Sequence, residues 1–293
     1  MKEKLNARIM IIYTLVIILG LVCLLPLWNI VAISLSGPAA VAGNKVGLIP
    51  VDLTFGAYEK IMSDGQFWRS FGISVLRVAI TLALNLVLIV LMAYPLAKSK
   101  RVFRGRTLYM NLMIFAMLFN GGMIPTYLVV KQLGLLNTIW ALILPGAVPI
   151  FSVILVMNFF RGIPKALEEA AIIDGATPLQ VLFQVFIPIS LPSLATVSLF
   201  SIVGTWNDFM GGLIYITKAK DYPLMTYIQA LNVNIADAIK NNASAEQIAN
   251  LAQLSDKNLN AAKIMVAIIP LLLIYPMLQK YFVTGMVVGS VKE

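Results

Sequence analysis

Charged side chains inside strongly apolar stretches are the residues of this sequence best placed to do chemistry. Asp208 follows Trp206 and Asn207 near the end of one such stretch, and Arg77 lies inside another. A charge in hydrocarbon is costly and therefore marks a functional or interhelical contact. We expect Asp208 on a helix that faces the bundle interior, where it either bonds another helix or contacts a substrate. Arg77 either snorkels to the outer surface or, with Lys131, serves as counter-charge to an anionic solute.

Other polar and aromatic residues of the apolar stretches complete the interior candidates for a substrate pathway: Asn85, Asn120 and Trp140. Glycine and proline predict breaks or kinks nearby, at Gly121-Gly122 before Pro125 and at Pro145 and Pro149. Broken helices can line a cavity, although both residue types are frequent in membrane spans.

Several chemistries are excluded by what the sequence lacks. It contains no histidine, and Cys23, its only cysteine, lies in an apolar run, which argues against a disulfide framework or a zinc cluster. There is no G-x-x-x-x-G-K-[ST] loop to hold ATP phosphates. We predict no catalytic residue, no metal site and no cofactor, and we interpret the 14 methionines as packing residues.

The composition is that of a membrane protein. Of the 293 residues, 60% are hydrophobic and 12% charged, whereas a soluble domain has about 25% charged residues. A spanning helix needs about 20 mostly apolar residues. Six stretches qualify, which predicts an all-α integral membrane protein with a single transmembrane domain over residues 1–293. We place the spans near 9–33, 72–96, 108–130, 136–160, 192–216 and 264–282.

Basic residues gather on one side of this arrangement. They precede the first span, fill the connection between the second and third spans, and open the connection after the fourth. By the positive-inside rule both termini and the connection 161–191 are cytoplasmic, while loops 34–71 and 217–263 lie outside. The net charge of +9 is thereby explained by topology and not by nucleic-acid binding.

The cytoplasmic connection 161–191, here called the coupling loop, reads as two short helices. The first begins after Pro164 and ends at Ile173, where Asp174 and Gly175 supply a stop. The second starts with Thr177 as N-cap and Pro178 at the first position. Its spacing predicts one apolar stripe, made of Leu179, Leu182, Phe183 and Phe186, before Pro188 and Pro192 end the helix. The alternative is an amphipathic loop lying on lipid headgroups.

The coupling loop also resembles a known family. Glu169-Ala170-Ala171, followed by Gly175 and by Val185-Phe186-Ile187-Pro188, is similar to the EAA motif of permease subunits of binding-protein-dependent ABC importers. Val185 and Ile187 replace the family's usual Ile and Leu. The resemblance extends to Trp206–Phe209, Ala93–Ala97 and the chain end. It is greatest for the second permease of maltose-type oligosaccharide importers, and within that group for the smaller permease of alginate importers.

The resemblance implies a type I importer permease fold with cytoplasmic coupling helices. The first short helix would dock into a cleft on a separate ATPase, with Glu169 paired to a basic residue there and Glu168 in solvent. The residues implied in ATPase coupling are Glu168, Glu169, Ala170, Ala171, Asp174, Gly175 and Pro178. The tail 284–293 would lie between the ATPase subunits.

The same resemblance implies partners and a location. They are a second homologous permease forming a heterodimer, two cytoplasmic ATPases carrying ATP and Mg²⁺, an extracytoplasmic solute-binding protein, membrane lipid and an oligosaccharide such as an alginate fragment. The membrane would be the bacterial inner membrane. Segment 37–58 and loop 217–263, with a short helix near 248–254, would meet the binding protein, or the loop would only cap the surface.

Two other classes remain open from the residues. An ion-coupled secondary transporter usually shows repeated spans and a buried ionisable relay, neither of which is clear here. An intramembrane enzyme acting on lipid or polysaccharide would need acids such as Asp208 and Glu169, but these fall in different predicted compartments.

Overall fold

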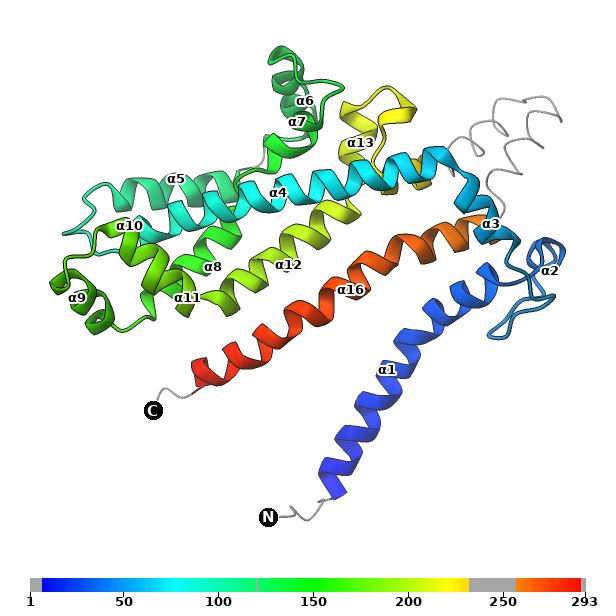
Figure 1. Ribbon diagram of the computed structural model, residues 1–293, viewed down its shortest axis with the longest axis horizontal. Helices are drawn as coiled ribbons and strands as arrows, with labels where there is room; N and C mark the ends of the chain where they lie inside the picture. Colours follow the sequence, from blue (N-terminus) through cyan, green and yellow to red (C-terminus); the bar gives the residue numbers. More distant parts are fainter. Residues whose placement is uncertain (1–6, 120, 232–256, 291–293) are drawn as a thin grey trace. The chain divides into compact units, whose positions relative to one another are not determined.

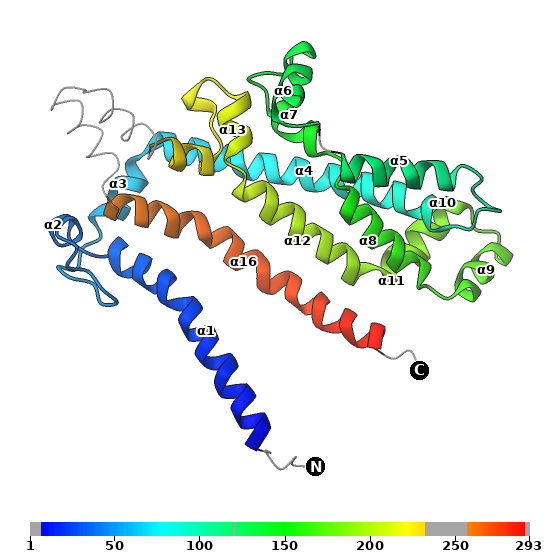
Figure 2. The same ribbon diagram turned by 180° about the vertical axis from the view of Figure 1, so that it is seen from behind.

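The computed structural model describes residues 7–119, 121–231 and 257–290, and within these ranges every regular element is helical. The described chain groups into two compact units. One contains residues up to 68 together with 227–269, and the other contains 69–226 together with the rest of the last helix. Figures 1 and 2 show the helices of both from opposite sides.

The first unit is built around two membrane-length helices. It contains α1 (Ala7–Ser34), α2 (Pro38–Ala42), α3 (Gly56–Ser63) and the first part of α16 (Lys257–Ser290). The side chains of α1 are exposed from Met10 to Leu27, as a lipid-facing helix requires. At its end the Asn258 amide of α16 donates to the carbonyls of Ile33 and Ser36. A buried polar contact therefore joins the two helices.

The second unit is a bundle along α4 (Gly65–Ala97). In both views α5 (Arg106–Leu118), α8 (Ile150–Arg161) and α12 (Leu191–Asn207) run beside α4. Its shorter helices are α6 (Met123–Gln132), α7 (Ile139–Ile143), α9 (Lys165–Ile173), α10 (Pro178–Val181), α11 (Ile187–Ile189) and α13 (Met210–Tyr215). The core joins α4, α8 and the coupling loop through side chains such as Ala93, Met157, Phe160 and Phe186.

The predicted all-α, six-span class is confirmed. Three described helices are long and apolar enough to cross a membrane unbroken: Met10–Ser34, Gly65–Ala97 and Lys257–Gln279. Counting each of three bent helix pairs as one span raises the number to six. α5 and α6 meet at 114°, the segments 139–146 and 150–161 at 49°, and the segments 178–189 and 191–207 at 80°. The breaks predicted at Gly121-Gly122 and at Pro145 and Pro149 fall at the first two bends.

Three expectations from the sequence concern the end of span five, the C-terminal tail and a short helix near 248–254. Span five does not continue as a helix to residue 216, because α12 ends at Asn207 and Asp208 has extended backbone angles (φ −72°, ψ 105°). The predicted tail is helical as far as Ser290. The short helix expected near 248–254 falls outside the described residues.

Candidate functional site

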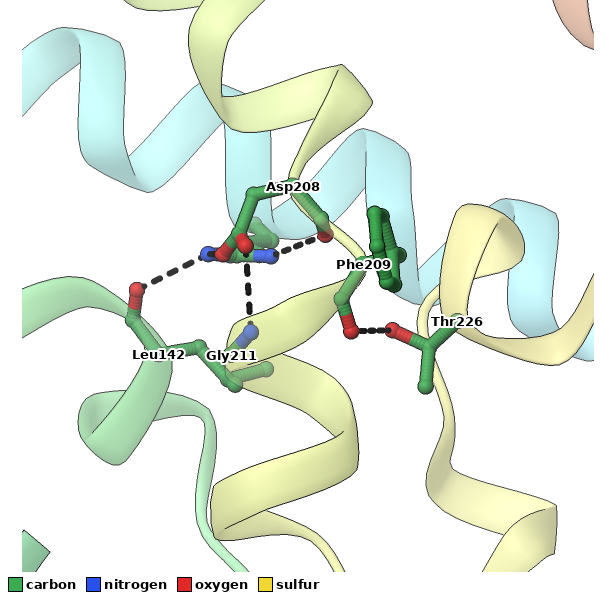
Figure 3. A network of polar contacts seen from close by, with 6 residues as sticks. Leu142, Asp208, Phe209, Gly211 and Thr226 are labelled. Atoms are coloured by element: carbon green, nitrogen blue, oxygen red, sulfur yellow. Dashed lines mark hydrogen bonds and ion pairs between the residues drawn. The ribbon is translucent and has the colours of Figure 1, made fainter. Parts of the chain in front are cut away.

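A buried ion pair holds three spans of the second unit together. Arg77 of α4 donates from one terminal nitrogen to the Oδ2 atom of Asp208 at 2.5 Å and to the carbonyl of Leu142 at 3.1 Å. Its other terminal nitrogen reaches the Asp208 carbonyl at 3.3 Å. The exposed fractions are 5% for the Arg77 side chain and 34% for that of Asp208. Figure 3 shows this network, in which two backbone carbonyls freed at helix ends receive charged donors.

The break between α12 and α13 is shaped around Asp208. Its Oδ1 atom accepts the Gly211 N–H at 3.0 Å, and the Thr226 hydroxyl donates to the Phe209 carbonyl at 2.9 Å (Figure 3). A Cβ at Gly211 would lie 2.6 Å from Asp208 Oδ2, and one at Gly212 would overlap the Thr226 hydroxyl. Both positions need glycine because these side chains approach the backbone closely.

Two expectations about these charges are wrong. Arg77 does not snorkel to the outer surface, because it is 4% exposed and engaged with backbone and carboxylate oxygens. Asp208 does not sit within a helix, because it terminates α12. Of the two roles considered for Asp208, the structure shows the interhelical bond. Arg77 is thus paired with Asp208, while its buried Nε atom has no hydrogen-bond partner among the described residues.

Two adjoining cavities lie beside the ion pair. One, of about 260 Å³, is bounded by Arg77 and Asp208, and the other has about 200 Å³. They share Asn85, Gly204 and Thr205. The Asn85 amide lies 3.0 Å from the Ser201 hydroxyl; with its oxygen turned to that hydroxyl, its nitrogen also reaches the Thr81 and Ala147 carbonyls. The cavities thus offer hydroxyl and amide groups, not charge alone.

Sequence reasoning missed three of the small polar residues at these cavities: Thr81, Ser201 and Thr205. The buried Thr81 hydroxyl has no hydrogen-bond partner among the described residues, so it is available to a ligand or water. A periodic signal was present in the sequence. Residues 77, 81 and 85 are spaced by four on α4, and 201 and 205 by four on α12, which places each set on one helix face.

The remaining interior candidates do not line these cavities. Trp206 is buried against Phe71, with ring centroids 5.6 Å apart. Asn207 and Trp140 are at least partly exposed, the latter on α7, and Lys131 is exposed on α6. Asn120 lies outside the described residues. The structure therefore brings together Arg77, Asn85 and Asp208 from the predicted set and leaves the others apart.

The coupling loop has the two helices that its sequence predicts. α9 begins after Pro164 and ends at Ile173, and Gly175 has a φ of +81°, which L side chains rarely adopt. Its N–H donates to the Ile172 carbonyl at 3.0 Å, which closes the helix. The Thr177 hydroxyl and the Gln180 side chain form a reciprocal capping box at the start of α10, with Pro178 in its first turn.

The exposed surface of α9 is unusually apolar for a loop outside the bundle. Ile173 is 85% exposed, and Leu167 and Ile172 are also exposed. Glu169, Ala170, Asp174 and Pro178 lie on the surface, whereas Ala171 packs on the core. Glu168 is not fully solvated, contrary to the expectation, because its side chain is 26% exposed and pairs with Lys98 at 2.6 Å.

The predicted apolar stripe of the second helix is divided. Leu182 and Phe186 are buried, but Leu179 and Phe183 are 60% and 58% exposed. The two buried residues lie on one half of the stripe and the two exposed ones on the other, and residues 182–186 form a π-helical turn. Pro188 does not end the helix but lies within α11, and the sharp bend comes at Ser190.

Among the described residues no three acidic or thiol side chains gather as metal ligands.

Comparisons with known proteins agree with one another. A family model described as "Binding-protein-dependent transport system inner membrane component" matches residues 86–288. Protein LplC of Bacillus subtilis is 42% identical over 273 residues, which cover 93% of this chain and 90% of LplC. The polygalacturonan/rhamnogalacturonan transport system permease protein YtcP of the same organism is 39% identical, with 97% of both chains covered.

A solved structure is similar over nearly its whole length. It belongs to a bacterial ABC transporter involved in the import of the acidic polysaccharide alginate. Its TM-score is 0.82 and its sequence identity 32%, and the match covers 96% of this chain and 99% of that one.

Proposed function

This chain belongs to the family of binding-protein-dependent transport system inner membrane components, and we propose that it is one of two permease subunits of an ATP-driven oligosaccharide importer. The family consists of multi-pass membrane subunits of transporters, which work with a binding protein and other permease subunits. The observation that carries the proposal is α9, a short helix with exposed isoleucines held outside the bundle by the Gly175 turn.

An exposed apolar helix end of this kind suits a protein interface. Exposed to water, the side chains of Ile172 and Ile173 contribute no hydrophobic stabilisation. Their burial in a partner's cleft would stabilise the complex. Glu169 at the same surface can pair with a basic residue of that partner. We assign the partner as one of two cytoplasmic ATPase subunits, which carry ATP and Mg²⁺. The permease itself has no ATPase site and binds no metal or cofactor in this proposal.

The polar cavities favour a substrate rich in hydroxyl groups. The Thr81 hydroxyl, the Asn85 amide and the Thr205 hydroxyl can each exchange hydrogen bonds with sugar hydroxyls. The named substrates of YtcP and of the alginate importer are polysaccharides rich in acid groups, which makes uronate oligosaccharides, alginate fragments included, the first candidates. Because Arg77 is occupied by Asp208, the cation for a uronate would come from another residue or from the second permease.

Orientation and assembly follow from the charge pattern and the family. Both termini and the coupling loop face the cytoplasm of a bacterial inner membrane, and a distinct homologous permease completes a heterodimer. Segments 37–58 and 217–263 lie outside and meet the solute-binding protein. ATP-driven closure of the ATPases moves α9, opens the cavity outward to receive sugar, and hydrolysis resets it, which is alternating access.

The test is uptake into proteoliposomes that hold the permease pair and its ATPases, with binding protein and labelled oligosaccharide supplied outside. We expect uptake only with ATP inside. Uptake on a proton or sodium gradient without ATP would instead favour a secondary transporter, and chemical change of the sugar without ATP would favour an enzyme. Neutral and uronate oligosaccharides of equal length, offered in competition, identify the substrate class.

A further inference from the structure

The end of α4 carries a lysine in an aromatic and acidic surround. The Lys98 ammonium lies 2.6 Å from Glu168 Oε1 of α9 and sits over the rings of Tyr94 and Phe186, at 4.1 and 4.3 Å from their centroids. Tyr94 belongs to α4 and Phe186 to the π-helical turn of the coupling loop. One ammonium group therefore contacts both helical parts of the coupling loop from the end of α4.

This pair differs from an ordinary surface ion pair in its burial. The exposed fractions of the side chains are 12% for Lys98 and 26% for Glu168, against 53% and 32% for the Arg69–Asp221 pair of the same unit. Partial desolvation strengthens both the Coulomb attraction and the cation–π contacts. The cost of separating Lys98 from Glu168 is correspondingly higher, so the two groups move together.

The neighbouring backbone is also fixed. The Leu96 carbonyl accepts hydrogen bonds from Arg106 Nε at 2.9 Å and from a terminal nitrogen of Arg161 at 3.2 Å. These arginines belong to the first turn of α5 and the last turn of α8. The end of α4 thus contacts α5 and α8 through the Leu96 carbonyl. Lys98, the residue after α4, contacts the coupling loop through Glu168.

From this end α4 leads to the ion pair of the cavities without a break. Lys98 and Arg77 are 21 positions apart, which is about 31 Å along a helix. Arg77 holds Asp208 and the Leu142 carbonyl, each at the end of a shorter helix. A displacement of α9 that pulls Lys98 would therefore shift α4 and, with it, the walls of the cavities.

We propose that the Lys98–Glu168 pair is the positioning contact that transmits movement of α9 to α4 and so to the Arg77–Asp208 cavities. The inference rests on the proposed importer function and deepens it. It assigns Glu168 an internal role, in contrast to the exposed Glu169, which is left to face the ATPase. Because a chain of contacts alone does not establish coupling, the test measures coupling energy between the two residues.

The experiment compares substrate transported per ATP hydrolysed in the reconstituted full transporter. We expect Lys98→Met and Glu168→Gln each to lower this ratio about ten-fold, the equivalent of about 1.4 kcal/mol. The double variant should be no worse than either single one, because each already breaks the same contact. Arg69→Met, which breaks the exposed pair, is the matched control and should leave the ratio within about two-fold.

Assembly is checked by co-purification of the subunits, and Glu168→Gln, which keeps the side-chain shape, decides the outcome if Lys98→Met fails to assemble. Unchanged ratios in Glu168→Gln, or additive losses in the double variant, overturn the inference. Absence of ATP-driven uptake in the wild-type transporter would instead overturn the proposed function.

Discussion

Replacement of Asp208 by asparagine tests the reasoning about the buried ion pair most directly. The amide side chain would keep the shape of the carboxylate and an oxygen for the Gly211 N–H, but it would remove the negative charge from Arg77. The guanidinium, only 5% exposed, would then face two carbonyl oxygens and no carboxylate. An uncompensated charge in so little solvent is unfavourable.

The magnitude follows from how unequally the two partners are buried. Removing one partner of a buried pair costs about 3–5 kcal/mol, and the 34% exposure of Asp208 places the cost of Asp208→Asn at the lower end, about 3 kcal/mol. Arg77→Met should cost at least as much: the carboxylate left behind can be hydrated and still accepts from Gly211, but the Leu142 and Asp208 carbonyls both lose their donor. The double variant should resemble Arg77→Met, which corresponds to a coupling of about 2–3 kcal/mol.

Unfolding of the full chain in mixed micelles, titrated with SDS and followed by tryptophan fluorescence, measures these differences. Asp221→Asn, which breaks the exposed pair with Arg69, is the matched control and should change the free energy of unfolding by less than about 1 kcal/mol. The reasoning is refuted if Asp208→Asn destabilises no more than Asp221→Asn does, or if the effects of Arg77→Met and Asp208→Asn are simply additive.

Three further predictions follow from local geometry. Gly212→Ala should lower the free energy of unfolding by about 1–3 kcal/mol in the same titration, because its Cβ would lie 2.8 Å from the Thr226 Cβ. Gly72→Ala is the matched control on α4, where the space around the Cβ is open, and should raise that free energy by about 0.5–1 kcal/mol. Gly175→Pro and Glu169→Lys should leave membrane insertion intact but uncouple ATP hydrolysis from uptake in proteoliposomes. Proline cannot adopt the φ of +81° at position 175, and lysine at position 169 reverses the charge of the surface proposed to face the ATPase. Coupled uptake in both variants would contradict this. Burial raises the pKa of Asp64, but the Tyr227 hydroxyl, the Phe67 N–H and the Lys263 ammonium outweigh it and hold that pKa below its ordinary 3.8. The carboxylate therefore contributes stability above about pH 4 that is lost as the pH falls through the lowered pKa, so the melting temperature of Asp64→Asn should vary less between about pH 2 and 6 than that of the wild type.

Features encoded within a few residues could be predicted from the sequence. The ends of α9 and the start of α10 follow from Pro164, Gly175 and the Thr177–Gln180 capping box, each of which acts on the adjacent backbone. The six spans follow from hydropathy, because a membrane imposes a minimum apolar length. The kinks near Pro145 and Pro149 were marked by the residues that cause them.

Pairings between distant residues could not be predicted. Arg77 and Asp208 are 131 positions apart, and Lys98 and Glu168 are 70 apart, so their contacts depend on how the spans pack. Hydropathy also missed the end of α12, because the apolar stretch resumes directly after Asp208 at Phe209, so that α12 and α13 read as one span. The π-helical turn was missed for a similar reason, since apolar spacing assumes a uniform helical repeat.

The buried arginine and the broken helices depend on one another. A helix that ends within a span leaves carbonyls without intrahelical partners, and lipid offers none, so Leu142 and Asp208 need donors from elsewhere in the protein. A guanidinium supplies several donors in one plane but needs a carboxylate to offset its charge, which Asp208 provides from the same break. Without the breaks Arg77 would lose two of its acceptors, and without Arg77 the breaks would expose unpaired carbonyls beside the cavities. The network therefore stabilises irregular backbone directly beside the polar cavities.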